Sequence, residues 1–285
     1  MAPRSAIRTT PRPSRRALLG AAVGTMALGA CGKSTEELEV PYHDAFVIAH
    51  RGGGRNWPEM TLYAYQQAAQ LSGLGRMEVS VRRSRDGVLL CHHDATTGRV
   101  GTQDLEIAKT DWKDLARVAI SPRETLDPSQ PGRPLARFQE VLDAWPEGIE
   151  MWVEPKSDDA VEPLFRKLSH LPDLKVVWKR PINAPGFDKA KQQGWGTFGY
   201  VLAGEKQFSY LEQVAPSKEL DHVGVPVEAD DERIRRVVDL AGSYGTSTVA
   251  WALSDLAQRD RVLRLGCRGL MCSNIVELLD APMPQ

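Results

Sequence analysis

Short apolar runs alternate with amphipathic stretches along most of the chain, and the two kinds of segment differ in hydrophobic period. The run at 46–49 is continuously apolar, as expected of a strand that is covered on both faces. From 59 to 71, apolar residues recur at helical spacing, for example at Leu62, Tyr65 and Ala69. The chain therefore opens with a strand followed by a helix.

The next two apolar runs are separated by a strong turn signal. Residues 77–83 alternate apolar and polar side chains, as in a strand, and Asp-Gly follows at 86–87. A parallel crossover needs about a dozen residues, so 88–94 is expected to return antiparallel, as a hairpin arm. A two-residue turn would place His93 roughly opposite Ser80.

The remaining pattern continues the alternation of strand and helix. The apolar runs that predict strands are 46–49, 77–81, 149–153, 175–178, 197–202, 222–227, 247–253 and 269–272. Helical segments are expected at 135–145, 160–170, 187–193, 208–214, 231–244 and 256–265. Eight strands alternating with helices indicate an α/β fold of the (β/α)₈ TIM-barrel type, for which about 250 residues is usual. An open doubly wound sheet is the alternative that the same alternation permits.

One stretch, 95–133, lacks a clear period. It holds a helical patch at 112–118 and a turn-rich segment at 121–134. We expect a short insertion here, within a single domain that spans 45–280.

Composition excludes some classes of protein. The 285 residues are 42% hydrophobic and 26% charged, with a formal net charge of −1, which is ordinary for a globular protein. Basic residues are not in excess over acidic ones, so the composition does not indicate a nucleic-acid-binding protein. Beyond the N-terminal region, Cys91, Cys267 and Cys272 remain. An odd number gives no clean disulfide framework and their spacing fits no zinc motif, so buried free thiols are expected.

The N-terminus has the features of an export signal. An arginine pair at 15–16 precedes an uncharged apolar run at 17–30, which is too short to span a bilayer as a helix. The pair resembles a twin-arginine signal, and Leu-Gly-Ala-Cys at 28–31 resembles a bacterial lipobox. We expect a signal peptide at 1–30, a lipidated Cys31 and a tether at 31–44. The protein would then be exported and anchored on the outer face of the cell membrane; alternatively, Cys31 is only a small thiol in an apolar run.

Polar residues interrupt the apolar strands near their carboxyl ends. Those that we expect to converge are His50, Arg51, Glu78, Ser80, His93, Glu154 and Lys156. Residues two apart on a strand share a face, and charges directed at a core are costly unless they are paired or ligated. A functional cluster is therefore the economical interpretation.

Each of these residues also has a structural explanation. His50 and Arg51 can be solvated strand ends, and His93 can be a core histidine with satisfied hydrogen bonds. Lys156 can simply pair with Glu154. His92 should point away from His93, so we expect it to be structural.

The order of these motifs resembles that of the glycerophosphodiester phosphodiesterase family. The family pattern is roughly His-Arg, Pro-Glu-Asn-Thr, Glu-x-Asp, His-Asp and Glu-x-Lys. The corresponding stretches here are His-Arg at 50–51, Pro-Glu-Met-Thr at 58–61, Glu-Val-Ser at 78–80, His-Asp at 93–94 and Glu-Pro-Lys at 154–156. The resemblance implies a TIM barrel of the phospholipase-C-like phosphodiesterase type.

The resemblance also implies roles for individual residues. His50 and His93 would be the acid–base pair, and Arg51 and Lys156 would bind the phosphate. Glu59 would belong to the site, although a carboxylate in the first turn of a helix is its alternative role.

A divalent metal cation, Ca²⁺ or Mg²⁺, is implied as well, held by Glu78, Glu154 and the residue at position 80. That residue is Ser80 where the family has aspartate. Serine can offer a neutral oxygen but not the missing negative charge, so we expect weaker metal binding, a changed metal preference or lost activity.

Three functions remain open from sequence. A phosphoric diester hydrolase would cleave glycerophosphodiesters to glycerol 3-phosphate and an alcohol, in lipid metabolism. A phospholipase-like enzyme would cleave intact lipid. A catalytically degraded lipoprotein would bind phosphodiesters without turnover, and Ser80 is the feature that favours it.

The localisation hypothesis has a direct test. Cys31→Ser removes the lipid acceptor of the lipobox, so the protein should be released from the membrane fraction into the medium. Fractionation of cells expressing the wild-type chain and the variant in parallel measures this. A variant that stays in the membrane fraction would show that Cys31 does not anchor the protein.

Overall fold

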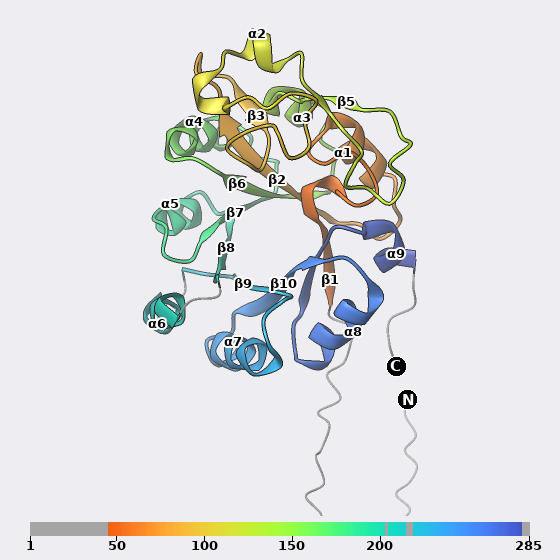
Figure 1. The fold of residues 1–285 in the computed structure, drawn as a ribbon. Coiled ribbons are helices and arrows are strands. Elements are labelled where there is room, and N and C mark those ends of the chain that lie inside the picture. Colours follow the sequence, from red (N-terminus) through yellow and green to blue (C-terminus); the bar gives the residue numbers. More distant parts are fainter. Residues whose placement is uncertain (1–44, 203–204, 215–218, 281–285) are drawn as a thin grey trace, which may run out of the picture. The chain divides into compact units, whose positions relative to one another are not determined.

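Eight parallel strands form a closed barrel in the computed structural model, which describes residues 45–202, 205–214 and 219–280 (Figure 1). The strands are β1 (Phe46–Ala49), β2 (Arg76–Arg83), β6 (Glu150–Pro155), β7 (Val176–Pro181), β8 (Gly196–Tyr200), β9 (His222–Pro226), β10 (Ser247–Leu253) and β11 (Gly269–Cys272). Strand β1 closes the ring because it pairs with both β11 and β2. All eight predicted strands are present, and the barrel, not the open sheet, is confirmed.

Helices surround this barrel. They are α1 (Leu62–Ala68), α3 (Phe138–Asp143), α4 (Asp158–Ser169), α5 (Phe187–Gln192), α6 (Glu205–Val214), α7 (Asp231–Ser243), α8 (Leu256–Arg264) and α9 (Ile275–Asp280). Helix α1 begins later than predicted because Thr61 is its N-cap, whose side chain accepts a hydrogen bond from the Ala64 N–H at 3.1 Å. Within the described ranges, no helix has the length and apolar character needed to cross a membrane.

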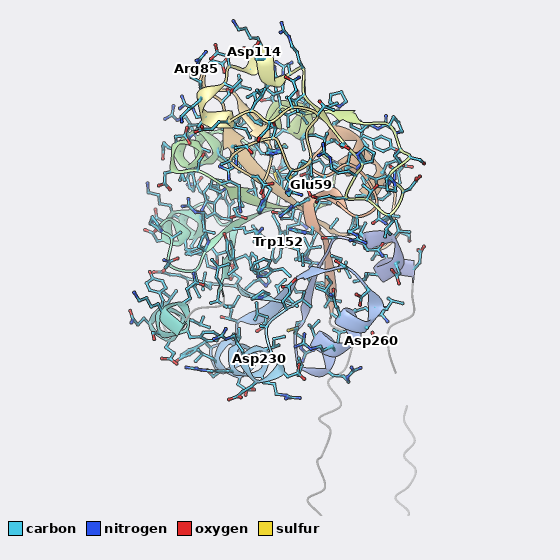
Figure 2. The ribbon with its side chains drawn as sticks, in the orientation of Figure 1. Glu59, Arg85, Asp114, Trp152, Asp230 and Asp260 are labelled. Carbon is cyan, nitrogen blue, oxygen red and sulfur yellow. The ribbon has the colours of Figure 1, made fainter. Side chains whose placement is uncertain are left out.

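Apolar side chains fill the interior of the barrel. Six of the strands contribute one buried residue each to this layer: Ile48, Trp152, Val177, Phe198, Val249 and Met271. Trp152 is fully buried and lies in the middle of the ring of strands (Figure 2). This packed layer closes the barrel below its carboxyl end. Inward residues further along the strands therefore face the region where such barrels carry their sites.

The hairpin arm forms as predicted, but with a different register. Strand β3 (Leu89–Cys91) pairs antiparallel with β2. The turn uses three residues, 85–87, with Gly87 at φ 92°, while the Ser84 N–H donates to the Val88 carbonyl at 2.9 Å. This shifts the pairing by one residue, so that the His92 N–H donates to the Ser80 carbonyl at 3.0 Å. The prediction that His93 lies opposite Ser80 is therefore wrong by one position.

The segment after the arm builds a small layer of its own. It contains a 3₁₀ turn (Ile107–Lys109), α2 (Trp112–Leu115), β4 (Ala119–Ile120) and β5 (Arg133–Pro134). A separate apolar cluster supports it: Leu90, Val100, Ile107, Leu115, Ile120 and Leu135. The Arg133 guanidinium lies 3.6 Å from the centre of the Tyr63 ring in α1, which ties the segment to that side of the barrel (Figure 1).

Several sequence predictions concern other residues. Cys91, Cys267 and Cys272 are buried free thiols, as predicted, and burial raises the pKa of each. The predicted signal peptide, the tether and Cys31 lie outside the described residues.

The interior layer predicts a large stability effect at Trp152. Trp152→Ala should lower the free energy of unfolding by about 3–5 kcal/mol, because it opens a cavity among buried neighbours. Leu126 is 55% exposed, so Leu126→Ala should change stability by less than about 0.5 kcal/mol. Urea unfolding of both variants measures this. A loss at Trp152 as small as that at Leu126 would contradict the packing described here.

Candidate active site

A buried lysine bridges two carboxylates at the carboxyl end of the barrel. Glu78 on β2 and Glu154 on β6 are 0% and 2% exposed. The Nζ atom of Lys179 on β7 lies 2.8 Å from Glu78 Oε1 and 2.8 Å from Glu154 Oε2. Sequence reasoning missed Lys179, although its place two residues after Val177 indicates the same inward face.

Other hydrogen-bond donors also contact the oxygens of the two carboxylates. Glu78 Oε1 accepts a hydrogen bond from the Ser80 hydroxyl at 3.1 Å, and Glu78 Oε2 accepts one from the Arg51 backbone N–H at 3.0 Å. Glu154 Oε1 accepts from Lys156 Nζ at 2.9 Å and from the Tyr200 hydroxyl at 2.8 Å. Three of the four carboxylate oxygens therefore accept hydrogen bonds, and the fourth, Glu154 Oε2, has the Lys179 ammonium at 2.8 Å but no hydrogen bond among the described residues.

These contacts set the charge states. Burial alone would raise the pKa of Glu78 and of Glu154, but the Lys179 ammonium outweighs it and both pKa values are lowered. For Lys179 the opposite holds. Burial alone would lower its pKa, but the charges of Glu154 and Glu78 outweigh this effect and the pKa is raised. All three groups are thus charged near neutral pH.

This arrangement does not fit the predicted metal. Ca²⁺ and Mg²⁺ require several oxygen ligands, and an ammonium group lies between the two carboxylates instead. In the part of the chain that the structure describes, no group of three or more His, Cys, Asp or Glu side chains could hold a metal ion. Glu78, Ser80 and Glu154 do come together as predicted, but around Lys179, so the donor set does not support the predicted cation.

Glu59 lies between two arginines. Arg51 Nη1 is 3.1 Å from Glu59 Oε2, and Arg99 Nη2 is 2.5 Å from Glu59 Oε1. Glu59 precedes the first residue of α1, Leu62, so the alternative of a first-turn carboxylate is wrong. It lies where the inserted segment meets the barrel (Figure 2). Arg99, which sequence reasoning missed, thereby ties that segment to the site.

The backbone at Arg51 is unusual. Its φ of 54° lies in the left-handed region, which is rare for residues other than glycine and is typical of functional positions. The Arg51 Nε atom is buried and has no hydrogen-bond partner among the described residues. Arg51 therefore retains at least one buried donor for a further acceptor.

His93 is held by the chain that follows the arm. Its Nδ1 lies 2.8 Å from Asp94 Oδ1, and Asp94 Oδ2 in turn accepts from Arg99 Nε at 2.5 Å. The Arg82 guanidinium donates to the His93 carbonyl at 2.9 Å. His92 is fully buried, with Nε2 at 3.0 Å from the Thr96 carbonyl, in agreement with the structural position predicted for it.

His50 lies just past β1, buried, with its Nδ1 at 2.9 Å from the Ser273 hydroxyl. Burial lowers its pKa well below the ordinary histidine value, and the positive charges of Arg51 and Lys179 lower it further. Burial also lowers the pKa of His93, against the opposing effect of Asp94. His50 adjoins Arg51 in the chain, and His93 is linked to Arg51 by successive contacts through Asp94, Arg99 and Glu59. Both histidines therefore lie beside one network of charged side chains.

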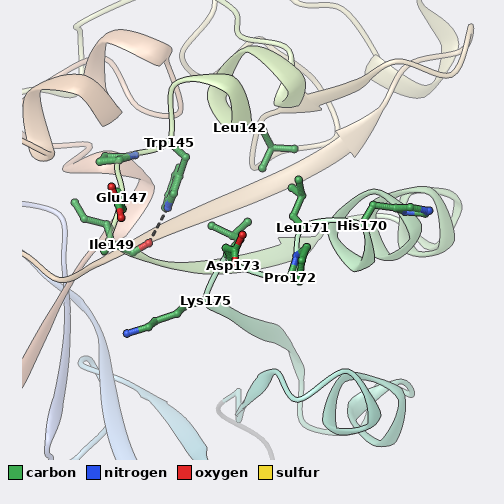
Figure 3. A pocket seen from close by; sticks show the side chains of 12 residues that line it. Leu142, Trp145, Glu147, Ile149, His170, Leu171, Pro172, Asp173 and Lys175 are labelled. Carbon is green, nitrogen blue, oxygen red and sulfur yellow. Dashed lines mark hydrogen bonds between the residues drawn. The ribbon is translucent and has the colours of Figure 1, made fainter.

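A separate cavity of about 460 Å³ lies at the other end of the barrel. Its lining includes Leu142, Trp145, Leu171 and Lys175 from the segments that lead into β6 and β7, and Trp145 donates to the Ile149 carbonyl at 2.8 Å (Figure 3). Neither His50, His93 nor Lys179 lines it. The charged cluster, not this cavity, is therefore the candidate site.

The chain is similar to a known protein family and to several curated proteins. The profile of the Glycerophosphoryl diester phosphodiesterase family matches residues 50–193. A probable glycerophosphodiester phosphodiesterase 1 of Mycobacterium tuberculosis is 46% identical over 57 residues, 20% of each chain. A glycerophosphodiester phosphodiesterase of Caldanaerobacter subterraneus is 43% identical over 53 residues, 19% of this chain and 21% of that protein. The matched stretches thus span about a fifth of these curated relatives.

Solved structures share the fold over most of the chain. A putative glycerophosphoryl diester phosphodiesterase of Agrobacterium tumefaciens has a TM-score of 0.66 at 14% identity, covering 82% of this chain and 96% of that one. An Oleispira antarctica phosphodiesterase, in complex with the product sn-glycerol-3-phosphate, has a TM-score of 0.62 at 20% identity, covering 82% and 95%. At such identities the likeness establishes the barrel alone. The profile match covers half of the chain and includes the histidines, the arginine and the buried carboxylates described above, and the chain therefore belongs to the Glycerophosphoryl diester phosphodiesterase family.

Proposed function

We propose that this chain hydrolyses glycerophosphodiesters, releasing glycerol 3-phosphate and an alcohol. The observation that carries the proposal is the convergence of His50 and His93 on one charged centre with Arg51 and Lys156. The two histidines come from different segments, the end of β1 and the stretch after β3. The product bound to the Oleispira phosphodiesterase supports glycerol 3-phosphate as the product here.

Arg51 and Lys156 are suited to bind the phosphate. The Arg51 Nε atom is a buried donor without a partner among the described residues, and guanidinium matches phosphate oxygens well. Lys156 Nζ contacts Glu154 at 2.9 Å, and an ammonium group has three donors. Both groups would also stabilise the charge that develops on the phosphate oxygens.

The two histidines can transfer the protons of the reaction. A hydroxyl of the glycerol attacks phosphorus while one histidine takes its proton, and the other gives a proton to the leaving alcohol oxygen. Water then opens the cyclic phosphate, with the two proton transfers reversed. Asp94 accepts a hydrogen bond from His93 in its protonated form, which stabilises the imidazolium. No step requires a metal.

Localisation at the outer face of the cell membrane is part of the proposal. An anchored enzyme there would act on phosphodiesters derived from lipids, in lipid metabolism. Parallel assays with intact phospholipid distinguish phospholipase-like cleavage, and binding without turnover would identify a degraded enzyme.

Removal of either histidine tests the mechanism. His50→Ala and His93→Ala should each lower the rate of glycerol 3-phosphate release by a factor of about 10²–10⁴. His170, which lies exposed at the end of α4, provides the matched control, and His170→Ala should leave the rate unchanged. Turnover near the wild-type rate in either site variant would remove that histidine from the mechanism.

The pH dependence follows from the lowered pKa values. Because the pKa of both histidines lies below the ordinary 6.5, the histidine that accepts the proton stays unprotonated as the pH falls towards that value, so the acidic limb of kcat/KM should lie below about pH 6.5. Asp94 raises the pKa of His93, so Asp94→Asn should move this limb to still lower pH. Asp173→Asn, at the opposite end of the barrel, should not move it. An acidic limb that already begins above pH 6.5 in the wild-type chain would count against the assignment.

A further inference from the structure

We propose that the Lys179 ammonium takes the place of the divalent cation that the family resemblance implies, so that Glu78 and Glu154 are held without a metal. Where it concerns turnover, this inference rests on the proposed function. It makes Lys179 a positioning residue, because it acts through the carboxylates and not on the substrate.

The position of Lys179 between the two carboxylates is the first observation that supports this replacement. Lys179 Nζ lies 2.8 Å from an oxygen of each carboxylate, and the residue is only 7% exposed. The carboxylates come from β2 and β6 and the lysine from β7, which are consecutive strands of the barrel. The ammonium therefore occupies the point at which a cation shared by both carboxylates would lie.

The oxygens around that point are already engaged. Glu78 also accepts hydrogen bonds from the Ser80 hydroxyl and the Arg51 N–H, and Glu154 accepts from Lys156 and Tyr200. Ser80 thus donates to the carboxylate next to it and does not present a charged ligand. A hard cation would have to displace a buried lysine and then coordinate oxygens of which all but Glu154 Oε2 already accept hydrogen bonds from other donors.

The two departures from the family pattern also balance in charge. The pattern places three carboxylates around a divalent cation, which leaves a net charge of minus one. Here Ser80 replaces one carboxylate and a single ammonium replaces the cation, which again leaves minus one. Ser80 and Lys179 are therefore best understood as a coupled pair, each of which makes the other tolerable in a buried site.

Lys179 also orders the residues that would meet the phosphate. Glu78 Oε2 accepts the backbone N–H of Arg51, whose φ is 54°, and Glu154 Oε1 accepts from Lys156. By fixing both carboxylates, Lys179 fixes the two cationic residues next to them.

Metal titration of the purified full chain tests this inference. Calorimetric titration with Ca²⁺, Mg²⁺ and Mn²⁺ should show no binding to the wild-type chain at millimolar metal, and neither metal nor EDTA should change its thermal midpoint. The double variant Ser80→Asp/Lys179→Met restores the third carboxylate and removes the ammonium. It should bind Ca²⁺ at least about tenfold more tightly than the wild type and gain thermal stability when metal is added.

The controls separate the role of Lys179 from general effects. Ser80→Asp alone leaves the ammonium in place and should bind metal no better than the wild type. Lys175→Met removes an exposed lysine just before β7 and should behave as the wild type in every assay. If the double variant does not fold, the wild-type titration decides by itself.

Turnover measured with and without EDTA distinguishes the two proposals. Equal rates support both. A wild-type chain that binds metal and loses turnover in EDTA overturns the replacement but keeps the phosphodiesterase function. No turnover under either condition, with the metal titrations as expected, overturns the function and keeps the replacement.

Discussion

The ion pairs of Lys179 with Glu78 and Glu154 are the interaction on which the rest of the site depends. Two carboxylates and an ammonium group are buried above the apolar layer of the barrel, where an unpaired charge is costly. Removing one partner of such a group leaves an uncompensated buried charge and typically costs about 3–5 kcal/mol. The sequence at these three positions is therefore constrained as a unit, and the neighbouring Arg51, Lys156 and Tyr200 are arranged around it.

The unequal lengths of the strands explain how His93 reaches this centre. Strand β1 ends at Ala49, which pairs with Met77, whereas β2 continues to Arg83. The carboxyl-terminal part of β2 therefore has no partner in β1, and it pairs with β3 at Val81 to Arg83 instead. The chain leaves this arm directly at His92 and His93, so the arm delivers a histidine to the barrel end without adding a barrel strand.

Much of the architecture could be predicted because it depends on local pattern. Short apolar or alternating runs identified all eight barrel strands, and the Asp-Gly turn identified the arm. The register of the arm could not be predicted, because it depends on whether the turn closes with two residues or three, and Gly87 allows both. The predicted start of α1, at Glu59, was too early. The helix begins at Leu62, because the side chain of Thr61 caps its first turn.

The site was predicted less completely than the fold, for a physical reason. His50, Arg51, Glu78, Glu154 and Lys156 lie in short motifs that can be recognised in sequence, and they do assemble. In the sequence, Tyr200 lies 46 residues from Glu154 and Lys179 lies 101 residues from Glu78. Arg99 comes from a stretch that has no clear hydrophobic period. Only the folded chain brings them together. The expectation of a metal followed from the motifs alone, and it could not include the lysine that pairs with their carboxylates.

The most direct measurement is a crystal structure of the chain grown with Ca²⁺, with anomalous data collected to locate the ion. We predict continuous density for Lys179 between Glu78 and Glu154, with Nζ at hydrogen-bonding distance from both, and no anomalous peak there. An anomalous peak at roughly 2.3–2.6 Å from oxygens of both carboxylates, with the Lys179 side chain turned away, would contradict it.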